Sequence, residues 1–105
     1  MIIGPSLASS GESQSELFRA ANRATFVGSP TAGTDGTAQS VTVPGGAKFF
    51  FTTTRVLYPD GSKHHGVGIV PDVFVEPTQA GLRAHRDEVY ETAVATLRGL
   101  VGKLP

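Results

Sequence analysis

Residues 9–27 decide the fold of this chain, and they read SSGESQSELFRAANRATFV. The segment opens with a capping box, in which Ser9 can cap a helix and Glu12 follows three residues later. Apolar residues then recur at three- and four-residue spacing, which predicts a helix that runs to about Asn22. The apolar residues on this face are Leu17, Phe18 and Ala21. A short strand is expected over residues 24–27, so a helix leads directly into a strand.

The strongest strand signal lies over residues 48–57, which read KFFFTTTRVL. Aromatic and β-branched residues dominate this run, as is typical of strands. Side chains alternate along a strand, so Phe49 and Phe51 would lie on one face and Phe50 on the other. Because both faces would need cover, we expect a central strand in a layered α/β fold.

Shorter elements are expected in the rest of the chain. A final helix should begin after Asp87, which can cap it, and run to about Val101 with an apolar stripe. Residues 77–85 should be irregular or form a single helical turn. Asp72 is expected to be structural and to accept backbone N–H bonds in an Asx-type turn. Further short strands are expected at 2–3, 38–43, 67–70 and 73–75. A helix, several strands and a C-terminal helix together predict an α/β architecture.

Composition excludes several classes of protein. Nine basic and nine acidic residues give a formal net charge of zero, which disfavours a strongly basic nucleic-acid-binding protein. No cysteine is present, so disulfides, thiolate metal sites and cysteine nucleophiles are excluded. No apolar run approaches the roughly 20 residues of a membrane span, and no signal peptide is recognisable. The 13 glycines and 7 prolines predict many turns.

The chain opens with Met-Ile-Ile-Gly-Pro, as if it entered in the middle of a buried strand. We therefore expect residues 1–105 to form a single, partial domain that is truncated at its amino-terminus. Apolar faces left bare by such a truncation would favour association, so a homodimer through these faces is a further expectation.

Five short motifs are spread along nearly the whole chain. They are Ser9-Ser10-Gly11-Glu12 before a helix, residues 23–33 (RATFVGSPTAG), Tyr58-Pro59-Asp60-Gly61, residues 66–72 (GVGIVPD) and Asp87 before the last helix. In this order and near this spacing they resemble the carboxyl-terminal half of the catalytic domain of the tail-specific (carboxyl-terminal processing) serine peptidases. That family also includes tricorn-type peptidases and the retinoid-binding repeat proteins of the retina.

The resemblance implies a crotonase-like layered α/β fold and a serine-type endopeptidase that works by acyl transfer. In the family the nucleophilic serine lies three residues before the glutamate of the first helix, a position that corresponds to Ser9. The tail-specific branch places a general-base lysine directly after the loop motif, whereas Thr34 follows Thr31-Ala32-Gly33 here. The chain is therefore closer to the tricorn-like branch, which lacks this lysine. That branch has a glutamate shortly before the Gly-Ile-x-Pro-Asp motif, and His65 lies closest to this place.

Ser9 is thus the candidate nucleophile, and Ser10 is the alternative one residue later. A serine needs a base to take its proton and a site for the developing oxyanion, and a helix N-terminus favours negative charge. Loop 28–36 would flank the substrate or form only a tight connection. The residues predicted for the oxyanion or substrate loop are Ser10, Gly11, Thr31 and Gly33. The competing interpretation is that Ser9 only caps the helix, which is the commoner use of serine there.

Several side chains in the chain are candidates for the base, among them His64 and His65, and the resemblance puts His65 nearest the place of the third catalytic member. Lys48 and Lys63 follow turns and should be solvated. His64 and His65 would point to opposite faces if they lie on a strand, although two exposed histidines beside a turn are the commoner arrangement. Neighbouring histidines cannot easily share one metal ion, and no third ligand has suitable spacing, so no metal site is predicted. The remaining candidate bases are His85 and Lys103.

The sequence therefore predicts a fragment of a serine peptidase that is itself inactive, because the base would come from residues outside it. Its substrate would be a peptide or protein, with no cofactor, nucleic acid or membrane span involved. Two alternatives stay open: a non-catalytic binding domain of the same fold, and an unrelated interaction domain in which Ser9 is a buried cap. Relatives are often exported, so the resemblance implies a location outside the cytoplasm, while the sequence itself leaves the compartment unknown.

Overall fold

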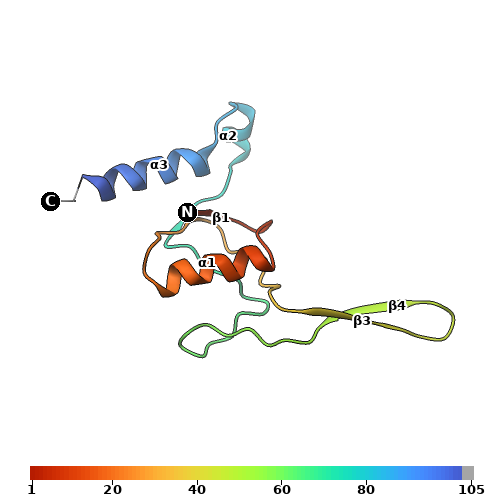
Figure 1. The fold of residues 1–105 in the computed structure, drawn as a ribbon. Coiled ribbons are helices and arrows are strands. Elements are labelled where there is room, and N and C mark those ends of the chain that lie inside the picture. Colours follow the sequence, from red (N-terminus) through yellow and green to blue (C-terminus); the bar gives the residue numbers. More distant parts are fainter. Residues whose placement is uncertain (103–105) are drawn as a thin grey trace.

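The computed structural model describes residues 1–102 and shows a small parallel sheet, a separate hairpin and three helices (Figure 1). The strands are β1 (Ile2–Ile3), β2 (Val27–Gly28), β3 (Ala38–Thr42), β4 (Lys48–Thr52) and β5 (Val73–Phe74). The helices are α1 (Ser10–Ala20), α2 (Gln79–Arg83) and α3 (Glu88–Val101). The chain thus has the mixture of helices and strands that the sequence predicts, with a helix at its carboxyl end.

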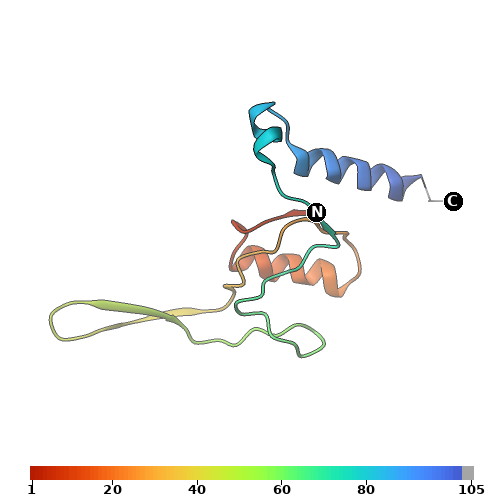
Figure 2. The same ribbon diagram turned by 180° about the vertical axis from the view of Figure 1, so that it is seen from behind.

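The parallel sheet has the strand order β1-β2-β5, and α1 connects its first two strands. Ile2 is in register with Val27, which is in register with Val73 on its other side. Gly28 has a φ of 132°, and a Cβ atom there would collide with the carbonyl oxygen of Ile3. Only glycine can bring the two strands together at this point. Both ribbon views place the sheet between α1 on one side and α3 on the other (Figures 1 and 2).

A small core supports α1. Ile3, Phe26 and Ile69 are buried together, and the guanidinium carbon of Arg19 lies 4.4 Å from the centre of the Phe26 ring. Arg19 also pairs with Asp72, whose carboxylate accepts a 2.6 Å hydrogen bond from the Phe26 N–H. Asp72 therefore accepts a backbone N–H bond, as predicted. Its partner is distant in sequence, however, and not in a local Asx-type turn.

β3 and β4 form an antiparallel hairpin that projects away from the rest of the chain (Figures 1 and 2). Val41 pairs with Phe49 across the hairpin, and every residue of both strands is exposed. The prediction of a central, covered strand over residues 48–57 is therefore wrong. Aromatic and β-branched composition favours a strand without specifying its neighbours, and the turn at residues 44–46 pairs β4 with the segment just before it.

The helix α1 begins where the sequence predicts and ends at Ala20, slightly before Asn22. Its buried residues are Glu12 and Ser15, whereas Leu17 and Phe18, which share the apolar face of the helix, are exposed. The spacing of apolar residues thus predicts the helix, and the helix buries a different face from the apolar one. The buried face is polar because it carries the site described below.

The carboxyl-terminal part follows the sequence prediction closely. The carboxylate of Asp87 accepts a 2.9 Å hydrogen bond from the Tyr90 N–H and caps α3, and α2 provides the helical turn expected within residues 77–85. An apolar groove of about 700 Å³ lies between α3 and the β1–β2 side of the sheet, lined in part by Ile2 and Leu97. Within residues 1–102, no helix is both long enough and apolar enough to cross a membrane.

Residues 67–70 do not form the predicted strand and belong to a long loop. Gly66 and Gly68 have φ values of 75° and 70°, which a strand does not contain. The N–H groups of Val67 and Gly68 both donate to the carbonyl oxygen of His64 at 3.0 Å. The loop therefore curls around His64, beneath the helix α1.

Candidate active site

Ser9 lies at the N-cap of α1 in a backbone conformation that residues other than glycine rarely adopt, with φ 52° and ψ −124°. Such a conformation costs roughly 1–3 kcal/mol and persists only where the surroundings enforce it. Ser9 is also exposed. The connection between β1 and α1 therefore presents this serine at the start of the helix, exposed and not buried as the alternative of an unrelated interaction domain would require.

Hydrogen bonds fix both backbone groups of Ser9. Its N–H donates to Oε2 of Glu12 at 3.1 Å, which is the carboxylate half of the predicted capping box. Its carbonyl oxygen accepts from the N–H groups of Glu12 and Ser13 at 2.8 and 3.1 Å. The surrounding structure thus holds the strained turn from both sides.

The two residues after Ser9 have different environments. Ser10 is the first residue of α1, so its N–H has no acceptor within the helix, and no other backbone acceptor is found for it within residues 1–102. Gly11 lies against Leu7, whose Cδ1 would be 2.5 Å from a Cβ atom at this position. The N–H of Ser10 is therefore open to an acceptor, and the absence of a side chain at Gly11 makes room for Leu7.

Glu12 is the centre of the site, and it has no exposed surface. Its Oε1 accepts hydrogen bonds from the Thr31 hydroxyl and, at 2.7 Å, from the Gly33 N–H. Its Oε2 accepts from the Thr34 N–H at 3.0 Å, in addition to Ser9. Burial alone would raise the pKa of Glu12, but these hydrogen bonds and a neighbouring histidine outweigh it and lower the pKa. Glu12 is therefore a buried anion that ties the loop after β2 to the Ser9 turn.

Thr31 and Gly33, which were predicted for the oxyanion or substrate loop, are directed inward at Glu12. The Thr31 hydroxyl also accepts a 2.8 Å hydrogen bond from the Ile69 N–H. Gly33 has a φ of 67°, and a Cβ atom there would lie 2.7 Å from the backbone nitrogen of Gly68. These contacts pack the loop after β2 against the loop around His64. A contact of either residue with a substrate stays a prediction.

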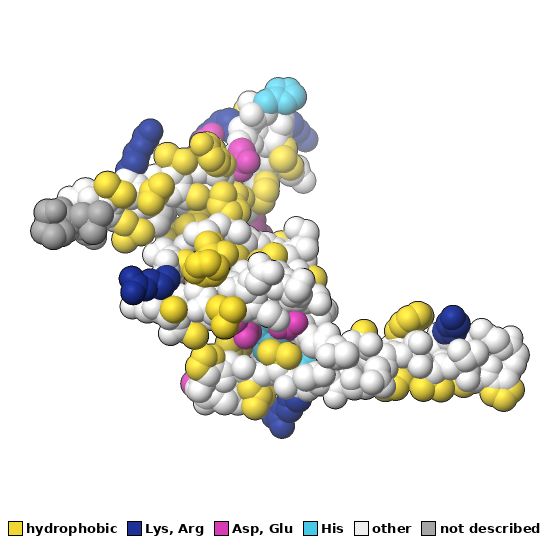
Figure 3. All heavy atoms as spheres, in the orientation of Figure 1, with side chains coloured by type: hydrophobic (Ala, Val, Ile, Leu, Met, Phe, Trp, Pro, Cys, Tyr) yellow, Lys and Arg dark blue, Asp and Glu magenta, His cyan; other side chains and the backbone are white. Residues whose placement is uncertain are grey.

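His64 has no exposed surface, which contradicts the expectation of two exposed histidines. Its Nδ1 lies 2.6 Å from Oε1 of Glu16 and its Nε2 lies 3.5 Å from Oε1 of Glu12. The Tyr58 ring meets the imidazole edge-on, with 5.5 Å between ring centres. Figure 3 shows acidic and histidine side chains gathered where α1 meets the loop beneath it. The structure therefore contains a Glu–His–Glu cluster at α1 in which Glu12 and His64 are buried and Glu16 is partly exposed.

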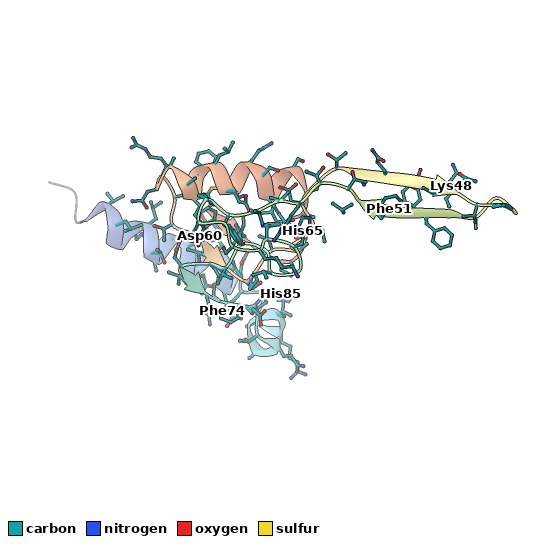
Figure 4. The ribbon with its side chains drawn as sticks, turned by 90° about the horizontal axis from the view of Figure 1, so that it is seen from below. Lys48, Phe51, Asp60, His65, Phe74 and His85 are labelled. Carbon is teal, nitrogen blue, oxygen red and sulfur yellow. The ribbon has the colours of Figure 1, made fainter. Side chains whose placement is uncertain are left out.

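His65, the candidate suggested by the resemblance, is half-buried in a turn and not on a strand. It lies at the base of the hairpin (Figure 4), next to Gly36, and its buried Nε2 has no hydrogen-bond partner within residues 1–102. The structure does not join it to Ser9 by a hydrogen bond. The other candidate bases that the structure describes, all exposed, are His85, Lys48 and Lys63. Lys103 lies outside the described residues.

Sequence reasoning singled out Ser9, Thr31 and Gly33 but not the pair Glu12 and Glu16 as a unit. Residues four apart lie on the same face of a helix, so this spacing puts both carboxylates on one side of α1. That signal points to a cationic or hydrogen-bonding partner. The spacing of the two glutamates could not identify His64 as this partner, because its contacts with Glu12 and Glu16 join residues at least 48 positions apart.

Comparisons with known proteins find a matching family and similar folds. The model of peptidase family S41 matches residues 1–75. A candidate peptidase from Parabacteroides merdae is 25% identical with a TM-score of 0.83, and the match covers 91% of this chain and 30% of that chain. Mature CPAF in complex with lactacystin is 21% identical with a TM-score of 0.77, covering 97% of this chain and 20% of that chain.

The photosystem II D1 C-terminal processing protease is 24% identical with a TM-score of 0.55, and the match covers 72% of this chain and 20% of that chain. The likeness to this protease and to CPAF is one of fold. The chain spans less than a third of the length of each of these solved structures. A comparison with curated proteins finds no significant match.

Proposed function

Because the chain belongs to peptidase family S41, a family of serine peptidases, we propose that it carries the nucleophile of a serine endopeptidase, Ser9. The observation that carries this proposal is an exposed serine in a strained turn between a strand and a helix. Backbone strain gathers at functional sites, and a sharp strand-to-helix turn lifts a nucleophilic hydroxyl clear of the backbone. Family membership also argues against an unrelated interaction domain.

The proposed reaction is acyl transfer. Oγ of Ser9 bonds to the carbonyl carbon of the scissile peptide and gives its proton to a base, so that the carbonyl oxygen becomes an oxyanion. The oxyanion returns its electron pair, the C–N bond breaks, and the leaving amine takes the proton from the base. Water then hydrolyses the ester on Ser9 and releases a carboxylic acid. The N–H of Ser10 is the proposed oxyanion donor, because it lies next to the nucleophile at a helix N-terminus.

The base is proposed to come from chain outside these 105 residues. Both ring nitrogens of His64 and Nε2 of His65 lack hydrogen bonds within residues 1–102, so none of these three atoms accepts the Ser9 hydroxyl. The match to the Parabacteroides merdae structure covers only 30% of that chain, which leaves room in a relative of that length for a base and for the rest of a crotonase-like layered fold. The isolated chain should then have little or no activity, since losing the base costs orders of magnitude in rate. The half-buried His65 stays a candidate for orienting that base.

The proposed substrate is a peptide or protein. A second candidate function is a non-catalytic binding domain of the same fold, and it is favoured by Thr34, which stands where the tail-specific branch has its lysine. A homodimer through exposed apolar side chains of the hairpin is proposed as well, because an apolar surface of this kind favours association. The side chains concerned are Phe49, Phe51 and Val41, all at least 47% exposed.

A fluorophosphonate probe tests the proposed nucleophile. We would treat the 105-residue chain, and the longest polypeptide encoded by the same reading frame, and locate the label by peptide mass spectrometry. Ser9→Ala and Ser10→Ala are the matched variants. We expect label on Ser9 in the longer polypeptide, loss of that label in Ser9→Ala only, and much slower labelling of the 105-residue chain. Folded protein without label on Ser9 in either form would favour the non-catalytic binding domain, and equal labelling of both forms would contradict the proposed source of the base.

A further inference from the structure

The cluster beneath Ser9 contains polar atoms that the proposed reaction does not use. His64 is completely buried, and neither of its ring nitrogens makes a hydrogen bond of good geometry. Oε1 of Glu16, the nearest carboxylate oxygen, is also without a hydrogen bond although it lies only 2.6 Å from Nδ1. Buried polar groups are normally partnered because leaving them unpaired is costly. An ionic interaction between these groups would satisfy them.

Negatively charged side chains predominate around His64. Glu12 and Glu16 both lie within 3.5 Å of His64, and Asp35 adds its negative charge to the surroundings of Glu16. Arg19, which lies on the same helix, is engaged with Asp72 and with the carbonyl oxygen of Val70.

The Tyr58 ring and the His65 ring also lie beside His64, with 6.1 Å between the centres of the two imidazoles. Within residues 1–102, no lysine or arginine forms an ion pair with Glu12 or Glu16. A buried anion without a partner is strongly destabilising, so His64 is the group that can neutralise Glu12.

We propose that His64 is a buried imidazolium that bridges Glu12 and Glu16 and thereby positions Ser9. The link runs through Glu12, whose Oε1 lies beside Nε2 of His64 and whose Oε2 accepts the Ser9 N–H. The same carboxylate holds the N–H groups of Gly33 and Thr34. His64 is therefore a positioning residue and not the base. The positioning role rests on the proposed function of Ser9. The proposed charge state of His64 is independent of that function.

One competing arrangement has the same total charge. A proton on Glu16 and a neutral His64 would also place a single proton between Nδ1 and the carboxylate. Burial raises the pKa of Glu16, although the charge of His64 opposes this. The two arrangements differ at Nδ1. The imidazolium carries a proton on both ring nitrogens, whereas a neutral ring whose Nδ1 accepts the proton of Glu16 carries its own proton only on Nε2, beside Glu12.

Nitrogen-15 spectra of the imidazole rings distinguish these states without any assay of activity. The 105-residue chain would be labelled in its histidines, and the His64 signals would be assigned with a His64→Gln variant. We expect protons on both ring nitrogens of His64 at neutral pH. A neutral tautomer of His64 at neutral pH would overturn the proposal.

The positioning role is tested in the longer polypeptide that the fluorophosphonate labels. His64→Gln should slow labelling of Ser9 about 10- to 100-fold, as expected when a nucleophile is misplaced, and should lower kcat with little change in KM. His85→Gln is the matched control and should change neither. An imidazolium by nuclear magnetic resonance together with unchanged labelling in His64→Gln would overturn the positioning role. If Ser9 is unlabelled in the wild type, the proposed function fails, and the nitrogen-15 result still decides the charge state of His64.

Discussion

The substitution Glu12→Gln keeps the shape of a buried side chain and removes its charge. In the orientation that costs least, the new amide nitrogen replaces Oε1. The Thr31 hydroxyl can then rotate and accept a hydrogen bond, but the Gly33 N–H is left facing a donor. An orphaned buried N–H costs about 1–3 kcal/mol.

The bonds on the other oxygen weaken as well. The N–H groups of Ser9 and Thr34 would bond to a neutral oxygen, which removes about 1 kcal/mol each, because bonds to a charged group are roughly twice as strong. Relief of the desolvated charge offsets part of the loss. We therefore expect Glu12→Gln to lower the free energy of unfolding by about 2–4 kcal/mol, a large share of the roughly 5–15 kcal/mol typical of a domain.

Urea unfolding followed by circular dichroism at neutral pH measures this loss. Glu91→Gln is the matched control, because it makes the same chemical change at an exposed residue that is paired with Arg86. Exposed ion pairs of this kind contribute little to the free energy of unfolding. A Glu12→Gln variant within about 0.5 kcal/mol of the wild type, the range of ordinary surface substitutions, would refute the idea that this carboxylate holds the site together.

Three further predictions follow from individual contacts. The pKa of Glu12 is lower in the folded chain than its usual value of 4.5. The stability that the ionised Glu12 contributes is therefore complete above pH 4.5 and is lost as the pH falls through the pKa of the folded chain. The urea midpoint of the wild type should then fall in acid more steeply than that of Glu12→Gln. Gly99→Ala should stabilise α3 by about 0.5–1 kcal/mol, since no atom lies within 4 Å of the added methyl group. Gly33→Ala should instead destabilise the chain, because its methyl group would meet backbone nitrogen atoms. Thermal unfolding of the two variants compares these effects. Phe50→Ser should leave the melting temperature nearly unchanged, because this side chain is 74% exposed. Phe49→Ser, on the proposed dimer face, should reduce self-association measured by sedimentation velocity, and Phe50→Ser is the control variant.

Residues that are close in sequence are sufficient to predict where the helices α1 and α3 begin. The hydroxyl and carboxylate of residues 9–12 predict the start of α1, and Asp87 predicts the start of α3, because a cap acts over three residues. Order and spacing of the motifs also predict the family. These features depend on contacts between residues that are close in sequence or on patterns preserved along the whole chain.

Contacts between distant residues could not be predicted in the same way. The aromatic run in β4 indicates a strand but not that it pairs only with β3 and stays exposed. The pair His64–His65 looks like part of a solvated turn, and its burial depends on where α1 and the loop after β2 are placed. Leu17 and Phe18 mark a helix face correctly, but a buried carboxylate on the opposite face decides which side packs inward.

The central claim is that the strained turn presents Ser9 as a nucleophile with the N–H of Ser10 as an oxyanion donor. A crystal structure of the fluorophosphonate adduct of the longer polypeptide tests it most directly. We expect phosphorus bonded to Oγ of Ser9 and a phosphonyl oxygen about 2.7–3.1 Å from the Ser10 nitrogen, the distance of an oxyanion donor. An adduct on a different residue, or a phosphonyl oxygen directed away from the start of α1, would contradict the assignment.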